Sequence, residues 1–175
     1  MVFLERNHFI RDEKEEVENM YNYYKIISDE LKLGMTSEEI ETVAEDRTYN
    51  MDNYVIYPDA KQVLQILCGT YRLGIISDTW PSIDNQLRTL DVKQYFSFAA
   101  YSFELGVFKP DKRMYLEALD KCGCDAKETV FIDDSNVNLE GAASAGITPI
   151  LIASNPVSDV ETPYIKIHTL SELIM

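Results

Sequence analysis

The sequence of 175 residues predicts an α/β fold with a parallel sheet, preceded by a separate helical part. Two observations indicate the sheet. Apolar runs alternate with helical patterns from about residue 57 onward, and those runs are unbroken, as in strands buried on both faces. A third observation, the purely helical pattern of residues 1–56, indicates a small cap. We therefore expect a partial helical cap at 1–56 and an α/β core at 57–175.

The cap pattern consists of two helices. From about residue 11 to 33, apolar residues recur every three or four positions, which predicts an amphipathic helix. Thr36 and Glu39 then have the Thr-x-x-Glu spacing of a capping box, so a second helix begins there. The first helix contains the charged run RDEKEEVE at 11–18, which we interpret as a solvent-exposed helix face.

The core pattern alternates strands and helices in a regular order. Strands are expected at 73–78, 96–100, 129–133, 148–153 and 164–167, with helices at about 59–69, 81–90, 110–122 and 136–145 and a last helix at the C-terminus. Right-handed crossovers bring the carboxyl ends of such parallel strands to one edge of the sheet. Ligands bind at that edge.

Composition narrows the classes of partner. The net charge is −14, and residues 1–52 hold 14 acidic and 6 basic side chains, a local balance of −8. Such a surface repels nucleic acids and anionic membranes. No apolar run approaches the roughly 18 residues of a membrane span. We see no signal-peptide pattern, so we expect a cytoplasmic protein.

The three cysteines, Cys68, Cys122 and Cys124, are expected to be free thiols in a reducing compartment. Cys122 and Cys124 are too isolated from other ligands to predict a zinc site.

Polar side chains stand at three places where strands end or helices begin. Ser77 and Asp78 follow an apolar strand, Lys109 precedes a proline that opens a helix, and Asp133 and Asp134 end the strand VFID. Two adjacent carboxylates repel each other, so they require a positive partner. Mg²⁺, which prefers carboxylate oxygens, would supply it.

Together these groups suit a phosphate bridged to a divalent cation. Ser77 would donate to one phosphate oxygen, Lys109 would neutralise another, and the two aspartates would hold Mg²⁺. Each group also has a structural alternative: Ser77 as a helix cap, Lys109 as a surface charge, and the aspartates as the turn into a helix.

Small residues in the helix that follows the aspartates would let this helix lie close on the sheet; they are Gly141, Ala142, Ala143 and Ala145.

The segments LGIISDTW, ELGVFKPDKRMY and VFIDDSNVNLEGAASAG resemble, in this order, the second, third and fourth motifs of the haloacid dehalogenase superfamily, and of its phosphatase branches in particular. The resemblance covers about residues 57–153, and the helical cap agrees with it. It implies a Rossmann-like core, Mg²⁺, and phosphoryl transfer through an aspartyl-phosphate. By motif match it implies substrate contact for Ser77 and Asp78, a catalytic and phosphate-binding role for Lys109, and metal coordination by Asp133 and Asp134.

The sequence departs from that family at the first motif, an apolar strand ending Asp-x-Asp that supplies the nucleophile. The nearest candidate is MVFLERNHF, with Glu5 and Asn7 as degenerate counterparts, but we interpret residues 1–10 as cap or linker. The central first strand is therefore expected to be missing between the strands that end at Ser77 and Asp133. A rearranged N-terminal segment, a neighbouring chain in a homo-oligomer, or direct closure of the two strands would fill the gap.

Three functions follow from these expectations. The first is a Mg²⁺-dependent phosphatase for a small phosphorylated metabolite, inactive as it stands without its nucleophile motif. The second is a non-catalytic protein that binds a phosphorylated ligand or a partner. The third, a 2-haloacid dehalogenase, is disfavoured by Asp133 and Asp134, because the dehalogenating branch lacks this acidic pair.

Overall fold

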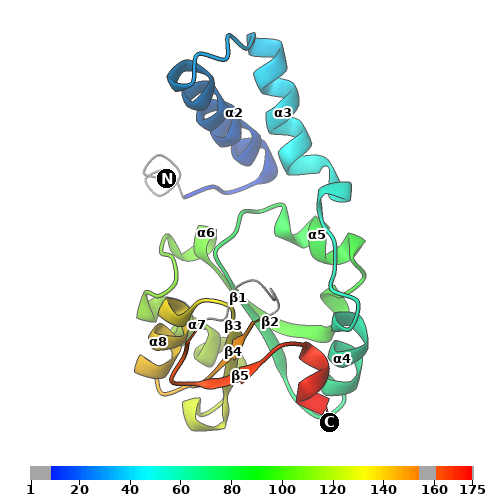
Figure 1. The fold of residues 1–175 in the computed structure, drawn as a ribbon, viewed down its shortest axis with the longest axis vertical. Helices are drawn as coiled ribbons and strands as arrows, with labels where there is room; N and C mark the ends of the chain where they lie inside the picture. The colour runs from blue at the N-terminus through cyan, green and yellow to red at the C-terminus, as the bar shows by residue number, and fades with distance from the viewer. Residues whose placement is uncertain (1–8, 154–160, 175) are drawn as a thin grey trace.

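The computed structural model describes residues 9–153 and 161–174, which form a helical cap above an α/β core (Figure 1). The cap is a hairpin of two helices, α2 (Glu13–Glu30) and α3 (Ser37–Tyr49), which pack against each other. Asp12 caps α2 by accepting from the backbone N–H of Glu15. Both halves of the predicted Thr36–Glu39 capping box are present at α3. The predicted cap helices are therefore confirmed.

The core strands are all parallel, as predicted. Strand β1 (Leu73–Ser77) pairs with β2 (Phe96–Tyr101), and Ser77 lies opposite Tyr101. Strands β3 (Val130–Asp133), β4 (Thr148–Ile152) and β5 (Ile165–Ile167) pair in that order. Each strand begins and ends within about one residue of its predicted bounds.

The strands form two separate ladders instead of one sheet. Within residues 9–153 and 161–174, β1 pairs only with β2, and no strand joins β1 to β3. Whether a further strand lies between β1 and β3 is not settled by the described residues, so the missing central strand stays a prediction. The N-terminal segment that we considered as a filler, including Glu5 and Asn7, lies outside the described residues, so the content of the gap stays a prediction.

Helices surround the two ladders. They are α4 (Ala60–Leu67), α5 (Ile83–Thr89), α6 (Ser102–Leu105), α7 (Lys112–Cys122) and α8 (Asn136–Ser144), with short 3₁₀ helices at Met51–Asn53, Lys93–Tyr95, Ala126–Glu128 and Leu170–Ile174. The C-terminal helix expected from the sequence is thus a 3₁₀ helix. None of the helices within the described residues is long and apolar enough to cross a membrane.

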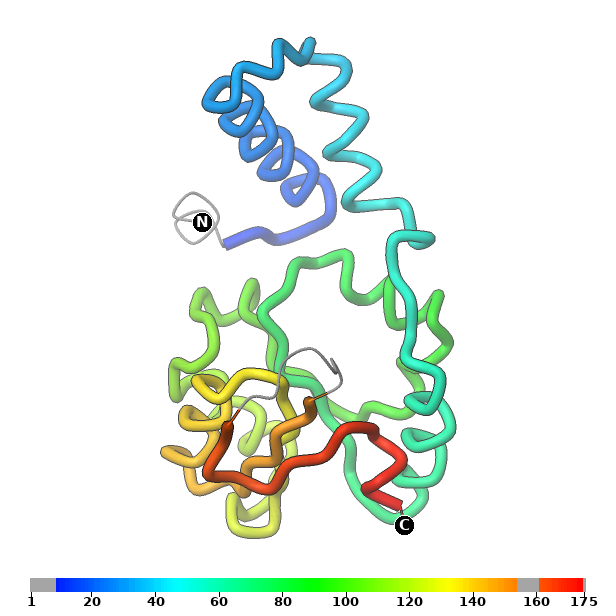
Figure 2. The backbone as a smooth tube through the Cα atoms, in the orientation of Figure 1, coloured from blue at the N-terminus to red at the C-terminus, as the bar shows by residue number. Residues whose placement is uncertain are grey.

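The main core lies between α7, α8, β3 and β4. Its buried members are Val107, Met114, Tyr115, Phe131, Leu139, Ala142, Ile147 and Leu151. Helix α7 also contacts β1 and β2, so it connects the two ladders. The backbone trace shows the chain passing from the cap into this core at residues 50–60, while the C-terminal segment lies beside α4 (Figure 2).

Gly141 is the small residue on which the packing of α8 depends. A Cβ atom there would lie 2.8 Å from the carbonyl oxygen of Pro110 and 2.8 Å from the Tyr115 hydroxyl. Ala142 is fully buried, but Ala143 is exposed, so its small size is not needed for close packing. The small residues thus serve the contact with α7 as well as the approach to the sheet.

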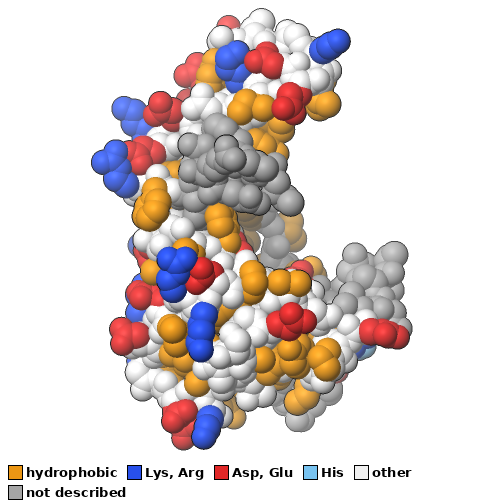
Figure 3. Space-filling model, turned by 90° about the vertical axis from the view of Figure 1, so that its left-hand side faces the viewer, with side chains coloured by type: hydrophobic (Ala, Val, Ile, Leu, Met, Phe, Trp, Pro, Cys, Tyr) orange, Lys and Arg blue, Asp and Glu red, His pale blue; other side chains and the backbone are white. Residues whose placement is uncertain are grey.

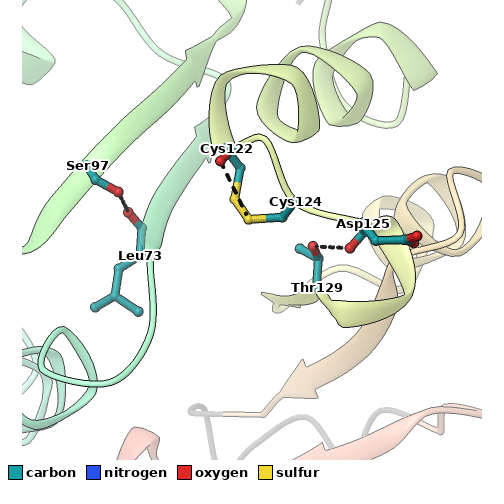
Figure 4. The surroundings of a disulfide bond; sticks show 6 residues. All are labelled: Leu73, Ser97, Cys122, Cys124, Asp125 and Thr129. Atoms are coloured by element: carbon teal, nitrogen blue, oxygen red, sulfur yellow. Dashed lines mark hydrogen bonds between the residues drawn. A yellow bond between two sulfur atoms is a disulfide. The ribbon is translucent and has the colours of Figure 1, made fainter.

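The expectation of three free cysteines is wrong for two of them. Cys68 is free and exposed, whereas Cys122 and Cys124 form a disulfide at the end of α7 (Figure 4). Gly123, between them, adopts a φ of +65°, a turn that glycine makes without steric cost. This turn brings the two cysteine Cα atoms to 5.2 Å, within the range that a disulfide can bridge.

The charged run at 11–18 also differs from its prediction at one position. Most of its acidic side chains are exposed or half-exposed, and acidic and basic groups are interspersed over the face shown in Figure 3. Glu16, however, is completely buried. Two hydrogen-bond donors of Ser82 satisfy its carboxylate, which makes burial of the charge tolerable.

Candidate active site

Three of the five predicted site residues meet at the carboxyl ends of the strands. Asp133 ends β3, Asp78 directly follows β1, and Lys109 lies just before α7. The Nζ atom of Lys109 lies 2.7 Å from Oδ2 of Asp133, and both side chains are largely buried, with exposed fractions of 12% and 8%. The backbone N–H of Lys109 donates to Oδ1 of Asp78 over 2.9 Å. Lys109 therefore joins the two ladders at this edge.

Contacts with a carboxylate and an aromatic ring hold the Lys109 side chain in place. The Lys109–Pro110 peptide bond is cis, and Asp111 caps α7 immediately afterwards. Lys109 also lies over the ring of Phe131, at 5.8 Å from its centroid. The ammonium group is thus held between an aromatic face and a carboxylate, which restricts its position.

Both oxygens of Asp133 accept hydrogen bonds. Oδ2 accepts from Lys109, while Oδ1 accepts from the backbone N–H of Ser135 at 2.9 Å and from the side-chain amide of Asn138 at 3.0 Å. The carbonyl of Asn138 accepts in turn from the Tyr115 hydroxyl over 2.7 Å. Asp133 is therefore fixed in orientation from three sides.

Asn138 and Tyr115 were missed by sequence reasoning. Asn138 stands five residues after Asp133, on the first turns of α8, where an amide can reach back to the strand end. The available signal was its position, a polar residue in the first turn of the helix that directly follows the strand end. Tyr115 gave none, because an aromatic residue at helical spacing is typical of a core.

Burial and neighbouring charges shift two ionisable groups. Burial raises the pKa of Asp78, and the hydrogen bond and the charge of Lys109 oppose this shift. Burial also raises the pKa of the Tyr115 hydroxyl above its usual range, and the negative charges of Asp133 and Asp78 add to the effect. Tyr115 is therefore a hydrogen-bond donor at neutral pH.

The remaining two predicted residues, Ser77 and Asp134, keep free polar atoms. Among the residues that the structure describes, neither the Ser77 hydroxyl nor the Asp134 carboxylate has a hydrogen-bond or ion-pair partner. Asp134 is exposed, and Ser77 is partly exposed at the end of β1. Both side chains are thus available to a ligand at the edge where Lys109 and Asp133 meet.

The donor set has the chemistry that Mg²⁺ prefers, since it offers carboxylate oxygens. Asp134 is unengaged, whereas Asp133 would share its oxygens with Lys109. Within the described ranges, no group of three or more His, Cys, Asp or Glu side chains is arranged to hold a metal ion. Mg²⁺ would therefore keep several of its waters here, and it would bind weakly.

Comparison with known proteins identifies the family of the chain. The profile of the haloacid dehalogenase-like hydrolases matches residues 4–146. Glyceraldehyde 3-phosphate phosphatase of Methanothermobacter thermautotrophicus is 30% identical over 108 residues, a match that covers 60% of this chain and 47% of that protein. The chain thus spans about half the length of this curated relative.

Two solved structures extend the comparison over nearly the whole chain. A 2-haloacid dehalogenase from Pseudomonas syringae pv. tomato is 26% identical, with a TM-score of 0.64, covering 99% of this chain and 72% of its own. A phosphatase of the same superfamily from Thermococcus onnurineus is 22% identical, with a TM-score of 0.66, covering 99% of this chain and 87% of its own. Because the family profile spans most of the sequence, the chain belongs to the haloacid dehalogenase-like hydrolase family.

Proposed function

We propose that this chain carries the phosphate- and metal-binding half of a Mg²⁺-dependent phosphatase for a small phosphorylated metabolite. The observation that carries the proposal is the Lys109–Asp133 ion pair, with unengaged Ser77 and Asp134 at the same edge. A largely buried ammonium beside a metal-binding carboxylate suits a dianionic group that bridges to a cation. The similarity to two phosphatases supports this assignment.

Each residue has a separate task in the proposed site. Ser77 donates its hydroxyl to one phosphate oxygen, and Lys109 neutralises another through Nζ. Asp78 holds the backbone of Lys109 and so fixes where the ammonium points. Asp134, with Asp133 beside it, holds Mg²⁺, which when bound polarises the phosphate.

Titration calorimetry with inorganic phosphate, in the presence and absence of Mg²⁺, tests this proposal. We expect phosphate binding that requires Mg²⁺ and that is lost in Lys109→Ala. Lys112→Ala is the matched control, since Lys112 is an exposed lysine three residues further on. Equal phosphate affinity in Lys109→Ala and the unaltered chain would overturn the assignment.

A 2-haloacid dehalogenase is the second candidate, because one of the similar structures is that of a 2-haloacid dehalogenase. A halide-release assay with a 2-haloacid separates the two candidates. We expect no release, because the resemblance implies that dehalogenating members lack the acidic pair that stands here at Asp133 and Asp134. A third candidate is a non-catalytic protein that binds phosphate. It predicts phosphate binding by calorimetry but no phosphatase turnover, either by the unaltered chain or by any variant of it.

A further inference from the structure

A buried carboxylate joins the cap to the core. Glu16, near the start of α2, has an exposed fraction of 0%, and so has Ser82, which precedes α5. Oε1 of Glu16 accepts from the Ser82 hydroxyl at 2.7 Å, and Oε2 accepts from the Ser82 backbone N–H at 2.9 Å. A single residue of the core thus satisfies both oxygens of a charge from the cap.

The loop that Ser82 ends is the loop that begins at the proposed phosphate site. At its start, Asp78 accepts from the backbone of Lys109. At the next residue, the Ser102 hydroxyl accepts from the Thr79 N–H at 2.8 Å and donates to the Thr79 carbonyl at 3.2 Å. Within this loop, the core therefore holds Asp78 and Thr79, and the cap holds Ser82.

The chain entering the cap touches a second site loop. The ring of Phe9 lies against Gly106, where a Cβ atom would come within 2.3 Å of the ring. Gly106 adopts a φ of +66° and stands three residues before Lys109. Two of the three loops that carry site residues thus contact the segment between Phe9 and Glu16.

We propose that Glu16 is a positioning residue, which fixes the loop after Ser77 and Asp78 through Ser82, so that the seating of the cap sets the geometry of the phosphate site. A buried carboxylate that loses its donors is costly, so α2 and Ser82 must move together. The part of the proposal that concerns phosphate binding rests on the proposed function. The coupling between the cap and the loop does not depend on that function.

The test uses residues 1–175 with four substitutions. Glu16→Ala removes the acceptor, Ser82→Ala removes one of the two donors, and Glu16→Gln keeps an acceptor for the N–H and a donor toward the hydroxyl. Glu13→Gln is the matched control, because Glu13 is on the same helix and bonds to Asn85 of the same core helix, but at a more exposed position.

Two measurements are made on each variant: backbone hydrogen exchange of residues 79–89 and 106–110, and affinity for inorganic phosphate with Mg²⁺. In Glu16→Ala and Ser82→Ala we expect faster exchange in both segments and phosphate affinity weakened roughly tenfold to a hundredfold, as for displaced positioning groups. Glu16→Gln should recover most of the slow exchange and most of the phosphate affinity. Glu13→Gln should match the unaltered chain in both measurements.

If Glu16 has only a structural role, its substitution should speed exchange in residues 79–89 alone. Exchange in residues 106–110 and the phosphate affinity would then stay unchanged, and this result would overturn the proposal. If Glu16→Ala does not fold, Ser82→Ala decides by the same criteria. If the unaltered chain binds no phosphate, the proposed function fails, while the exchange of 106–110 still decides whether the cap is coupled to the site loops.

Discussion

Two carboxylates of this molecule are buried by different means. Asp133 lies beside the ammonium of Lys109, whereas Glu16 accepts only from the uncharged donors of Ser82. Burial raises the pKa of Glu16 above its ordinary value of 4.5. The Ser82 hydrogen bonds and the charge of Arg47 on α3 oppose that shift, and the charge of Glu13 adds to it. The cap–core contact therefore responds to pH.

The direction of that response is a first prediction at the residue scale. Because the pKa of Glu16 is higher in the folded state, its contribution to stability is complete below pH 4.5 and is lost as the pH rises through the folded pKa. Glu16→Gln does not titrate at this position, so its stability does not fall in this way as the pH rises. The unfolding free energy of Glu16→Gln relative to the unaltered chain should therefore increase as the pH rises above 4.5 and then level off.

Urea unfolding between about pH 4 and pH 8 measures this difference. Glu18→Gln, at an exposed position on the same helix, serves as the control with the same change of charge. Parallel curves for Glu16→Gln and the unaltered chain would contradict the prediction.

Asn138 carries the second prediction, since it orients Asp133. Asn138→Ala removes a hydrogen bond to a charged acceptor, a loss of about 1.5–3 kcal/mol in unfolding free energy. It should also weaken Mg²⁺-dependent phosphate binding, because Asp133 becomes less fixed. Asn136→Ala is the control, since Asn136 stands on the same turn but donates to the carbonyl of Glu161. Equal phosphate affinity in Asn138→Ala and Asn136→Ala would show that Asn138 has no part in the site.

At the scale of the elements, periodicity and capping predicted most of the fold. The Thr36–Glu39 box and the apolar runs located α3 and all five strands, because these signals are local. Helix α6 was missed, since its four residues are too few to show a helical period. The burial of Glu16 was also missed, because the partner that makes it tolerable, Ser82, lies 66 residues away.

The candidate site was predictable only in part, because local sequence patterns locate residues but not the contacts between distant ones. Strand ends located Ser77, Asp78, Asp133 and Asp134, and the following proline located Lys109, but no local pattern gives the pairing of Lys109 with Asp133. The disulfide between Cys122 and Cys124 depends on the left-handed turn at Gly123, which composition does not reveal.

The contact of α7 with α8 gives the third prediction. Gly141→Ala would place a methyl group 2.8 Å from the Pro110 carbonyl, a backbone atom that cannot move without shifting Lys109. We expect a loss of about 1–3 kcal/mol in unfolding free energy, as for an overpacked core, and weaker phosphate binding. Gly69→Ala is the control, because a Cβ atom there meets its nearest neighbour at an ordinary 3.5 Å. Unchanged stability in Gly141→Ala would show that the helices separate at little cost.

At the scale of the whole molecule, the site lies where three parts meet. The β1–β2 ladder supplies Ser77 and Asp78, the β3–β4–β5 ladder supplies Asp133 and Asp134, and Lys109 joins them ahead of α7. The cap contacts the loop that follows β1 through the hydrogen bond between Glu16 and Ser82. The proposed phosphate binding therefore depends on how these parts are placed relative to one another.

The last prediction concerns turnover and follows from how the carboxylates of the site are used. Covalent phosphoryl transfer needs a free carboxylate beside the phosphate. Among the carboxylates that the structure describes at this edge, Asp78 accepts from Lys109, both oxygens of Asp133 accept hydrogen bonds, and Asp134 is the proposed Mg²⁺ ligand. We therefore expect residues 1–175 by themselves to hydrolyse p-nitrophenyl phosphate no faster than a Lys109→Ala, Asp134→Asn double variant.

A chain extended upstream by one apolar strand ending Asp-x-Asp should gain Mg²⁺-dependent turnover, since that strand would enter between β1 and β3 and supply the nucleophile at the edge where Lys109 and Asp134 already lie. Steady-state assays of both chains, each with its Asp134→Asn variant, measure this gain. Robust turnover by residues 1–175 that disappears in Asp134→Asn would place the nucleophile within these residues, and Glu5, outside the described residues, would be the first carboxylate to substitute.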